Sequence, residues 1–139
     1  MTVNNHLSSI KTTLRAAGLR ATKPRVEILA YLAKAGRPLD AETVTQAVSA
    51  HLVTVYRTLQ DLANQGIIYQ TDFRTGKAYF EYQQKHHHHI ICLICGQQEA
   101  IDLCLPNQLL KQVKTRTKKF SAVKNHTLEF FGHCCQCTK

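Results

Sequence analysis

In this 139-residue chain, the types and spacing of four cysteines point most clearly to a specific chemistry, the binding of a metal ion. Cys92 and Cys95 form one CxxC pair, and Cys134 and Cys137 form a second. Four thiolates from two such pairs suit tetrahedral Zn²⁺ and leave no coordination position for a catalytic water molecule. The spacing therefore predicts one structural zinc ion per chain, which would tie the end of the chain to an earlier strand.

Other interpretations of the cysteines remain open from the residues alone. Buried free thiols are one alternative, and a redox dithiol is another, because CxxC also serves oxidoreductases. Cys135 lies inside the second pair and is positioned to compete as a ligand, whereas Cys104 is expected to be a small buried side chain. Zinc deaminases also contain CxxC, but they need HxE and PCxxC motifs that this sequence lacks. We therefore predict no enzymatic activity and no small-molecule substrate.

Four consecutive histidines, His86, His87, His88 and His89, stand shortly before the first cysteine pair. In an extended segment, alternate side chains point to opposite faces, so His87 and His89 face one way while His86 and His88 face the other. Each pair is expected to contribute to a separate metal site with nitrogen and oxygen ligands. A solvated polar linker is the alternative interpretation of this tract.

A carboxylate and a fifth histidine extend these two pairs. Glu81 lies at the end of an expected strand, and a metal held by Glu81, His87 and His89 would bridge two domains and fix their relative orientation. His126, on an expected strand near the C-terminus, is a weaker candidate, because a single strand histidine is often a hydrogen-bonded core residue. The junction is therefore predicted to act as a metal-dependent switch.

The segment before the histidine tract reads as helices followed by a small hairpin. The first helix is expected to begin near Ser8 or Ser9, Asp40 is a candidate N-cap, and Gly66 ends the last helix. This pattern predicts a winged helix-turn-helix over residues 1–83. The expected helices span residues 10–17, 24–35, 41–50 and 52–65, and the expected strands span residues 67–72 and 77–82.

The second segment, residues 84–139, combines strands with one helix. Strands are expected around the histidine tract, over 97–102 and over 120–131, and a helix is expected to start near Pro106. A piece of about 55 residues has a small core and needs a staple or a partner. The predicted fold class is therefore α+β, with an N-terminal winged helix-turn-helix followed by a small α/β domain stapled by a four-cysteine zinc site.

Composition and charge narrow the class of protein further. Lys and Arg number 18 against 9 Asp and Glu, and the resulting net charge of +9 points to a polyanionic partner. Apolar residues make up 44% of the chain, which indicates a folded globular protein. No apolar run approaches the roughly 18 residues of a membrane span, and the N-terminus lacks a signal-peptide segment. We therefore expect a cytoplasmic protein with no membrane partner, whose cysteines are reduced and act as metal ligands.

Several stretches of the chain, taken in order, carry a resemblance to a known family: AGLRATKPRVEIL, LVTVYRTL, GKAYFE, HHHHIICLICG and NHTLEFFGHCCQC. Together they resemble the ferric uptake regulator (Fur) family of bacterial metal-dependent repressors over residues 14–137. The resemblance implies that the N-terminal winged helix binds DNA, that the C-terminal domain dimerises and that the paired cysteines hold structural zinc.

The expected DNA-binding surface centres on the last helix of the first segment. Its apolar stripe leaves Thr54, Arg57 and Thr58 on faces that can meet the major groove, where Arg pairs with guanine. The resemblance implies that Tyr56 and Arg57 contact DNA and that Arg20 reaches the minor groove, while packing at the helix edge is the alternative for Tyr56. Further basic side chains are expected to contact phosphates: Lys11, Arg15, Lys23 and Arg25.

The resemblance also implies two regulatory metal sites. Two imidazoles and a carboxylate suit either Fe²⁺ or Zn²⁺ as the regulatory ion. The residues that match the first site are Glu81, His87 and His89, and those that match the second are His86, His88 and His126.

This chain departs from the family pattern at both regulatory sites. Pro38 stands where family members often have a histidine, so the first site lacks a ligand unless Glu99 or Asp102 substitutes. Asn107 or Gln108 stands where the second site usually has a glutamate. The connection before the recognition helix also looks shorter than is usual in the family.

These observations predict a homodimeric transcriptional repressor of metal homeostasis genes. A divalent metal is expected to fix the two domains in an orientation that fits a palindromic operator in double-stranded DNA. One alternative is a structural-zinc dimer that binds DNA constitutively because its sensing sites are degenerate. The other is a switch driven by thiol oxidation and zinc release.

Overall fold

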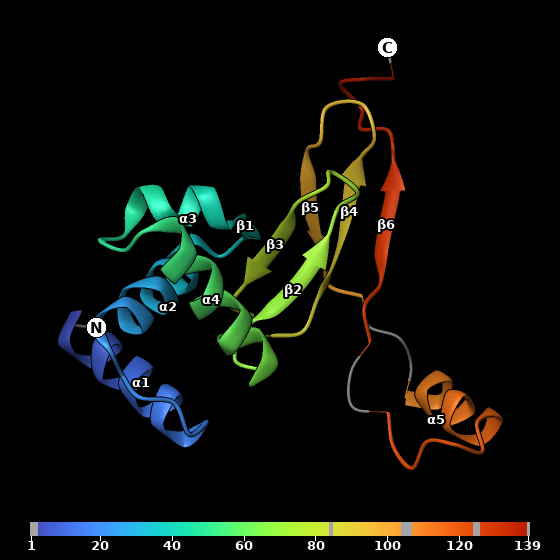
Figure 1. Cartoon of the computed structure of the whole chain (residues 1–139). Coiled ribbons are helices and arrows are strands. Elements are labelled where there is room, and N and C mark those ends of the chain that lie inside the picture. Colours follow the sequence, from blue (N-terminus) through green and yellow to red (C-terminus); the bar gives the residue numbers. More distant parts are fainter. Residues whose placement is uncertain (1–2, 84, 104–106, 124–125, 139) are drawn as a thin grey trace. The chain divides into compact units, whose positions relative to one another are not determined.

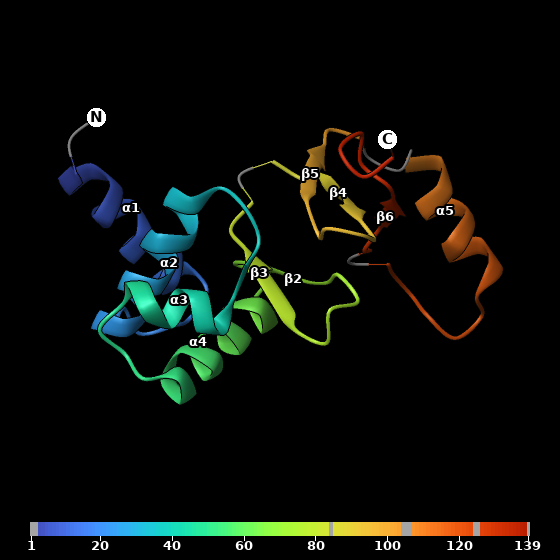
Figure 2. The same ribbon diagram turned by 90° about the horizontal axis from the view of Figure 1, so that it is seen from above.

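The structure is a computed structural model whose described residues are 3–83, 85–103, 107–123 and 126–138. It divides into two compact units, Met1–Gln84 and Lys85–Lys139. The first unit contains helices α1–α4 and strands β1–β3, and the second contains strands β4–β6 and helix α5 (Figures 1 and 2). The predicted α+β fold class is confirmed. Among the described residues, none of the helices combines the length and the apolar character that a bilayer crossing requires.

Four helices build the first unit: α1 (Val3–Ala16), α2 (Lys23–Ala35), α3 (Ala41–Ala47) and α4 (Leu52–Asn64). α2 packs against α1, α3 and α4. It carries Pro24 in its first turn, where no backbone N–H is needed, and it ends at Gly36 in the left-handed conformation (φ 58°). The helices enclose an apolar core in which Leu32, Leu59 and Phe80 are fully buried.

α1 begins earlier than the sequence predicted. Ser8 and Ser9 lie inside the helix and do not cap it, because no proline or glycine precedes them to stop the chain from continuing as a helix. The start near Ser8 or Ser9 is therefore corrected to Val3.

A small antiparallel sheet completes the first unit, in the order β1-β3-β2. β2 (Tyr69–Asp72) and β3 (Ala78–Glu81) form the predicted hairpin, and β1 (Leu39–Asp40) pairs with β3 so that Leu39 lies opposite Phe80. The sequence did not predict β1, because two residues are too few to show the alternation of a strand. The sheet and the helices together make the predicted winged helix-turn-helix.

The second unit is built on a sheet in the order β5-β4-β6. β4 (His88–Cys92) is antiparallel to β5 (Gln98–Ile101) and parallel to β6 (Glu129–Gly132), and α5 (Asn107–Arg116) precedes β6 in the chain. The last strand is much shorter than the predicted strand over 120–131. Cys104 and Pro106 lie outside the described residues, so their expected roles stay predictions.

Candidate functional site

Two turns present the four paired cysteines at one end of the second sheet. β4 ends at Cys92 and β6 ends at Gly132, and because these strands run parallel, both segments leave the sheet at the same edge. In the first turn, Gly96 N–H donates to Cys92 O (2.9 Å), and Gly96 has the positive φ of 73° that favours glycine. In the second turn, Cys137 N–H donates to Cys134 O (2.9 Å).

The sulfur atoms of the paired cysteines have the spacing of zinc ligands. Those of Cys92, Cys95, Cys134 and Cys137 all lie within 4.8 Å of one another, and Cys95 Sγ lies 3.7 Å from Cys134 Sγ. A tetrahedral Zn²⁺ with Zn–S bonds of about 2.3 Å has sulfur–sulfur separations of about 3.8 Å. The structure thus brings together four residues with the donor chemistry and the spacing that structural zinc needs. Cys135 is exposed beside this group.

Backbone N–H groups favour the thiolate form of Cys92. Hydrogen bonds from the N–H groups of Cys95, Cys134 and Ile94 lower the pKa of Cys92 to about 6. Cys134 N lies 3.3 Å from Cys92 Sγ. The thiolate is the form that binds a metal ion, so these hydrogen bonds prepare Cys92 for ligation, whereas hydrogen bonds with the Cys134 and Cys95 sulfur atoms raise the pKa of Cys137 to about 12.

Three imidazoles gather around the start of β4. The ring centroids of His86 and His88 lie 4.7 Å apart, and those of His126 lie 5.0 Å from His86 and 5.3 Å from His88. Their ligand atoms all lie within 4.8 Å of one another. Burial lowers the pKa of His86 and of His88, and neighbouring imidazoles lower both further. The neutral imidazole is the metal-binding form, so this group fits a divalent cation.

His87 and His89 form a separate group, with ring centroids 4.8 Å apart. His87 Nδ1 lies 3.0 Å from Lys85 O, a backbone contact of the kind that orients a ligating imidazole. His89 is buried. Glu81 belongs to the first unit, at the end of β3, where its buried carboxylate accepts a hydrogen bond from Gln83 Nε2 (2.9 Å).

The acidic residues expected to replace a missing ligand join neither histidine group. The register between β4 and β5 puts Glu99 on the face of the sheet away from His89, so the expectation for Glu99 in the first site is corrected. Asp102 instead accepts a hydrogen bond from Lys85 Nζ (2.5 Å) in an exposed ion pair. Glu129 lies directly opposite His89 in the register between β4 and β6. Sequence reasoning missed Glu129, because only the parallel pairing reveals this neighbour.

The N-terminal half of α4 presents the side chains expected to contact DNA. Thr54, Tyr56 and Arg57 are exposed, and Tyr56 keeps 49% of its surface accessible. Thr58 is buried at 7% exposure, which corrects its expected place at the groove, because it falls on the same helical stripe as the buried Val55. A hollow of about 520 Å³ lies between α4 and the base of the β2–β3 hairpin.

Arg25 connects two parts of the expected DNA-binding surface. Its Nη2 atom lies 2.9 Å from Asp61 Oδ2 on α4, and its Nη1 atom donates to Arg20 O (3.3 Å) in the loop before α2. Only 22% of the Arg25 side chain is exposed, whereas Arg20 is exposed. The guanidinium therefore holds α4 and the Arg20 loop together, although the sequence had predicted a phosphate contact for it.

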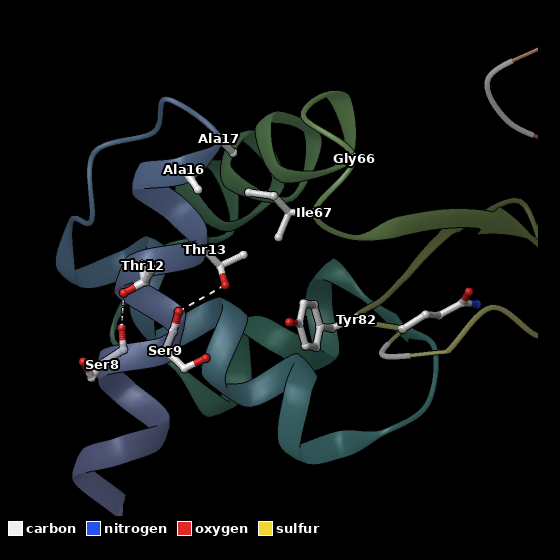
Figure 3. A pocket seen from close by; sticks show the side chains of 10 residues that line it. Ser8, Ser9, Thr12, Thr13, Ala16, Ala17, Gly66, Ile67 and Tyr82 are labelled. Atoms are coloured by element: carbon white, nitrogen blue, oxygen red, sulfur yellow. Dashed lines mark hydrogen bonds between the residues drawn. The ribbon is translucent and has the colours of Figure 1, made fainter.

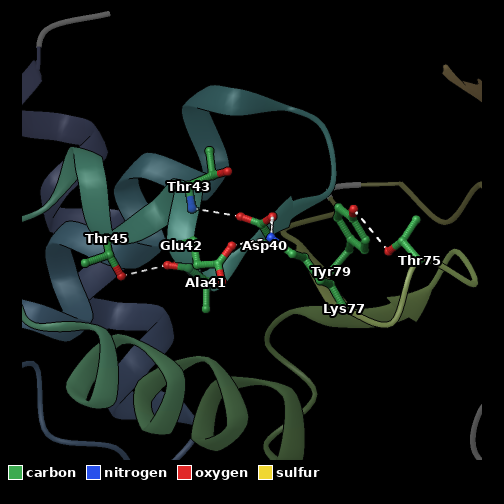
Figure 4. A network of polar contacts seen from close by, with 8 residues as sticks. All are labelled: Asp40, Ala41, Glu42, Thr43, Thr45, Thr75, Lys77 and Tyr79. Atoms are coloured by element: carbon green, nitrogen blue, oxygen red, sulfur yellow. Dashed lines mark hydrogen bonds and ion pairs between the residues drawn. The ribbon is translucent and has the colours of Figure 1, made fainter. Parts of the chain in front are cut away.

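A polar network fastens the base of the β2–β3 hairpin to the start of α3 (Figure 4). Lys77 Nζ contacts Glu42 and lies 3.5 Å from Asp40 Oδ2. Asp40 Oδ1 accepts a hydrogen bond from Thr43 N–H (2.7 Å), as expected of an N-cap. Partial burial acts to raise the pKa of Asp40, but the hydrogen bonds from Thr43 and the charge of Lys77 outweigh it and hold the pKa below 3.8.

A second hollow, of about 830 Å³, lies beside α1 and is bordered by Tyr82 (Figure 3). Its threonine hydroxyls are used within the helix: Thr12 Oγ1 donates to Ser8 O (3.0 Å) and Thr13 Oγ1 donates to Ser9 O (3.1 Å). The described lining contains no charged side chain. We therefore assign no ligand to this hollow.

Comparison with known proteins identifies the family. The model of the ferric uptake regulator family matches residues 16–131. The ferric uptake regulation protein of Shigella flexneri is 34% identical over 143 aligned residues, which cover 98% of this chain and 91% of that protein. The ferric uptake regulator of Vibrio cholerae has a similar crystal structure, with a TM-score of 0.68, 31% identity and coverage of 89% of this chain and 98% of that one.

The ferric uptake regulator of Pseudomonas aeruginosa, solved with manganese, is also similar in structure. Its TM-score is 0.70 at 28% identity, and the match covers 91% of this chain and 98% of that one. The predicted absence of enzymatic activity agrees with this kinship, because family members are regulators of transcription. Match length and sequence identity together show that this chain belongs to the ferric uptake regulator family of metal-responsive transcriptional regulators.

Proposed function

We propose that this chain is a homodimeric repressor that binds a palindromic DNA operator when Fe²⁺ or Zn²⁺ occupies its histidine sites, and that it controls metal homeostasis genes. The observation that carries the proposal is the separation of the histidine tract into two groups of closely spaced rings. The side chains of a solvated linker would be exposed, whereas His88 and His89 are each only 3% exposed. Buried imidazoles with neighbouring imidazoles are instead typical of metal ligands.

In this proposal, α4 reads the operator. The exposed side chains of Thr54, Tyr56 and Arg57 enter the major groove, where Arg57 pairs with guanine and Tyr56 contacts thymine methyl groups. Arg20 reaches the minor groove from the loop before α2. The related Vibrio cholerae regulator is described as having DNA-binding domains, which supports the assignment of this role to the first unit.

The metal acts by joining the two units. Glu81 from the first unit is assigned to the same ion as His87 and His89, so occupancy would restrict the orientation of the winged helix. His86, His88 and His126 would hold a second ion within the second unit. The bound metal would supply a positive charge, to which the neutral imidazole nitrogens and the carboxylate oxygen would act as electron-pair donors. Binding is coupled both ways: if metal favours the DNA-binding orientation, DNA raises the affinity for metal by the same factor.

Dimerisation is assigned to the second unit. Its exposed large apolar side chains have no cover within the described chain, and such a surface is typical of a protein interface. The residues are Ile90, Leu93, Ile94, Leu103, Leu109, Val113, Phe120 and Val123.

The regulatory role can be tested on the full-length, zinc-loaded protein. Operator fragments are selected from random duplex DNA, and their affinity is measured at buffered free Fe²⁺ and Zn²⁺. The variant His87→Ala/His89→Ala should lose the metal-dependent increase in affinity, whereas His6→Ala, which alters an exposed histidine on α1, should retain it. An increase that persists undiminished in the double variant would exclude the first regulatory site.

Thiol oxidation is the second candidate function, favoured by the exposure of Cys95 and Cys135. A peroxide would accept two electrons from two thiolates, which form a disulfide, release zinc and leave water or an alcohol as the reduced product. Zinc release measured with a chromogenic chelator during peroxide titration distinguishes this candidate. Loss of operator binding in step with zinc release would favour oxidation as the signal.

A further inference from the structure

The second unit contains the most strongly basic stretch of the molecule. Between Leu103 and Leu128 the sequence has six Lys and Arg residues and no Asp or Glu, so this stretch carries +6 of the chain's net charge of +9. In the chain as a whole, basic residues outnumber acidic ones only two to one. The second unit thus carries +5 of the net charge in its 55 residues, against +4 in the 84 residues of the first unit, so positive charge is denser in the second unit.

Five of these cations project from α5 and the residues that follow it. All five side chains are exposed, and no ion pair within the described residues involves them. Asp102, the acidic residue that precedes the stretch, is paired with Lys85. We call this surface the α5 basic patch; its residues are Lys111, Lys114, Arg116, Lys118 and Lys119.

Helix stability accounts for only part of this pattern. Lys114 and Arg116 lie in the last turn of α5, where cations interact favourably with the helix dipole. Lys111 and Lys114, however, are spaced three apart on one helix, and like charges at this spacing repel each other. Lys118 and Lys119 lie beyond the end of the helix. An array of this kind is stabilised by a polyanion that lies across it.

We propose that the α5 basic patch binds the phosphate backbone of duplex DNA, as a contact that is independent of base sequence and additional to α4. The inference rests on the proposed function, since the regulator is then already held on a duplex. Four of the five cations are lysines, which interact with phosphates as point charges without reading bases. Phe120 is the one exposed aromatic side chain beside the patch in the described chain, whereas single-stranded nucleic acid is bound by successive stacking rings.

The dependence of affinity on salt provides the test. Each phosphate contact contributes a slope of about −0.9 to the plot of log affinity against log salt concentration. The full-length, zinc-loaded variant Lys111→Gln/Lys114→Gln/Lys118→Gln should therefore have a slope shallower by up to about 2.7 per protomer. The ratio of the DNA affinity of the wild-type protein to that of the glutamine variant should fall by up to about 40-fold between 50 and 200 mM salt. Operator and unrelated duplexes should be affected equally.

Matched variants separate this proposal from the proposed function. Lys111→Arg/Lys114→Arg/Lys118→Arg keeps the charge and should keep the wild-type slope, while Arg57→Ala should weaken operator binding and leave unrelated duplexes nearly unaffected. An unchanged slope in the glutamine variant would overturn the α5 contact, and the effect of Arg57→Ala would show that operator recognition still stands. If the lost affinity is for single-stranded RNA and not for duplex DNA, the proposal is also wrong. α5 buries no side chain, so the glutamine variant should fold, as circular dichroism would verify.

Discussion

The two units differ in what holds them together. The apolar cluster of buried residues that runs from Ile10 to Phe80 in the described chain lies in the first unit. In the second unit, the buried residues within the described chain are Ile91, Cys92, His88 and His89. Three of these four carry donor atoms suited to metal ions. The first unit can therefore fold by burying apolar surface, whereas we expect the second to depend on metal ligation and a partner.

Exposed apolar side chains show the same contrast. Within the described part of the first unit, the large ones lie on α4, at Leu52, Val53 and Tyr56, where the proposed function places the DNA-binding surface. In the second unit they occur on strands, turns and α5. In the described chain, the first unit therefore exposes large apolar side chains on one helix, whereas the second unit exposes them across most of its elements.

The largest expected effect is unfolding of the second unit when one of the four cysteine ligands is replaced. Zinc binding to small domains contributes about 10–16 kcal/mol, far more than the sparse core of this unit can supply. Cys134→Ser should abolish zinc binding at the four-cysteine site, measured by metal analysis, and remove hydrogen-exchange protection from β4. Cys135→Ser is the matched control and should retain both. Protection of β4 that survives chelation would show that the second unit folds without metal.

A core substitution should act on the first unit alone. Phe80 is fully buried against the helices, so Phe80→Ala should lower the free energy of unfolding of this unit by about 3–5 kcal/mol. Zinc occupancy of the four-cysteine site should be unchanged. Val53→Ala serves as the control, because Val53 belongs to the same unit and is 63% exposed, so its truncation leaves no buried cavity. Zinc loss in the Phe80→Ala variant would contradict the independence of the two units.

The cap of α3 offers a smaller change with a defined pH dependence. Asp40→Ala should cost about 1 kcal/mol of stability, because Thr43 N–H loses its acceptor. Since the pKa of Asp40 is lowered in the folded state, its contribution is present above pH 3.8 and is lost as the pH falls through the folded-state value. Denaturant titrations at several pH values would measure it. Glu42→Ala removes an exposed contact to Lys77 and an acidic side chain from the first turn of α3, but no N-cap hydrogen bond, and should cost less.

The smallest expected effect concerns the link between Arg25 and Asp61. This partly exposed pair should contribute about 0.2–1 kcal/mol in a double-mutant cycle of Arg25→Gln and Asp61→Asn. The same cycle measured on operator affinity should show coupling, because the pair positions α4 and the Arg20 loop. If Arg25→Gln instead makes the salt dependence of DNA binding shallower by one contact, Arg25 binds phosphate directly.

The sequence predicts those features that depend on local periodicity and on ligand chemistry. The helices of the first unit follow from their apolar spacing, and the two ring groups of the histidine tract follow from alternation along an extended chain. Features set by pairing between distant segments were missed: β1, the position of Glu99 away from His89, and the neighbour Glu129. β1 and β6 each pair with a strand that is distant in the sequence, so the pattern within one segment does not identify its partner residues.

Side-chain contacts between residues that are distant in the sequence could not be predicted from the sequence either. Arg25 looks like any other surface cation in the sequence, and its contact with Asp61 spans 36 positions. Thr58 reads as polar, yet the helical stripe carries it into the core. Both errors came from inferring exposure from residue type, and burial depends on the neighbours that the fold supplies.

Measuring metal affinity with and without DNA tests the central claim most directly. Isothermal titration of Fe²⁺ or Zn²⁺ into the zinc-stapled, full-length protein should reveal tighter binding when a saturating operator duplex is present. The factor should equal the one by which metal strengthens operator binding, in the range of about 5 to 150-fold. Identical metal affinity in the two titrations would contradict the proposed coupling between the histidine sites and DNA recognition.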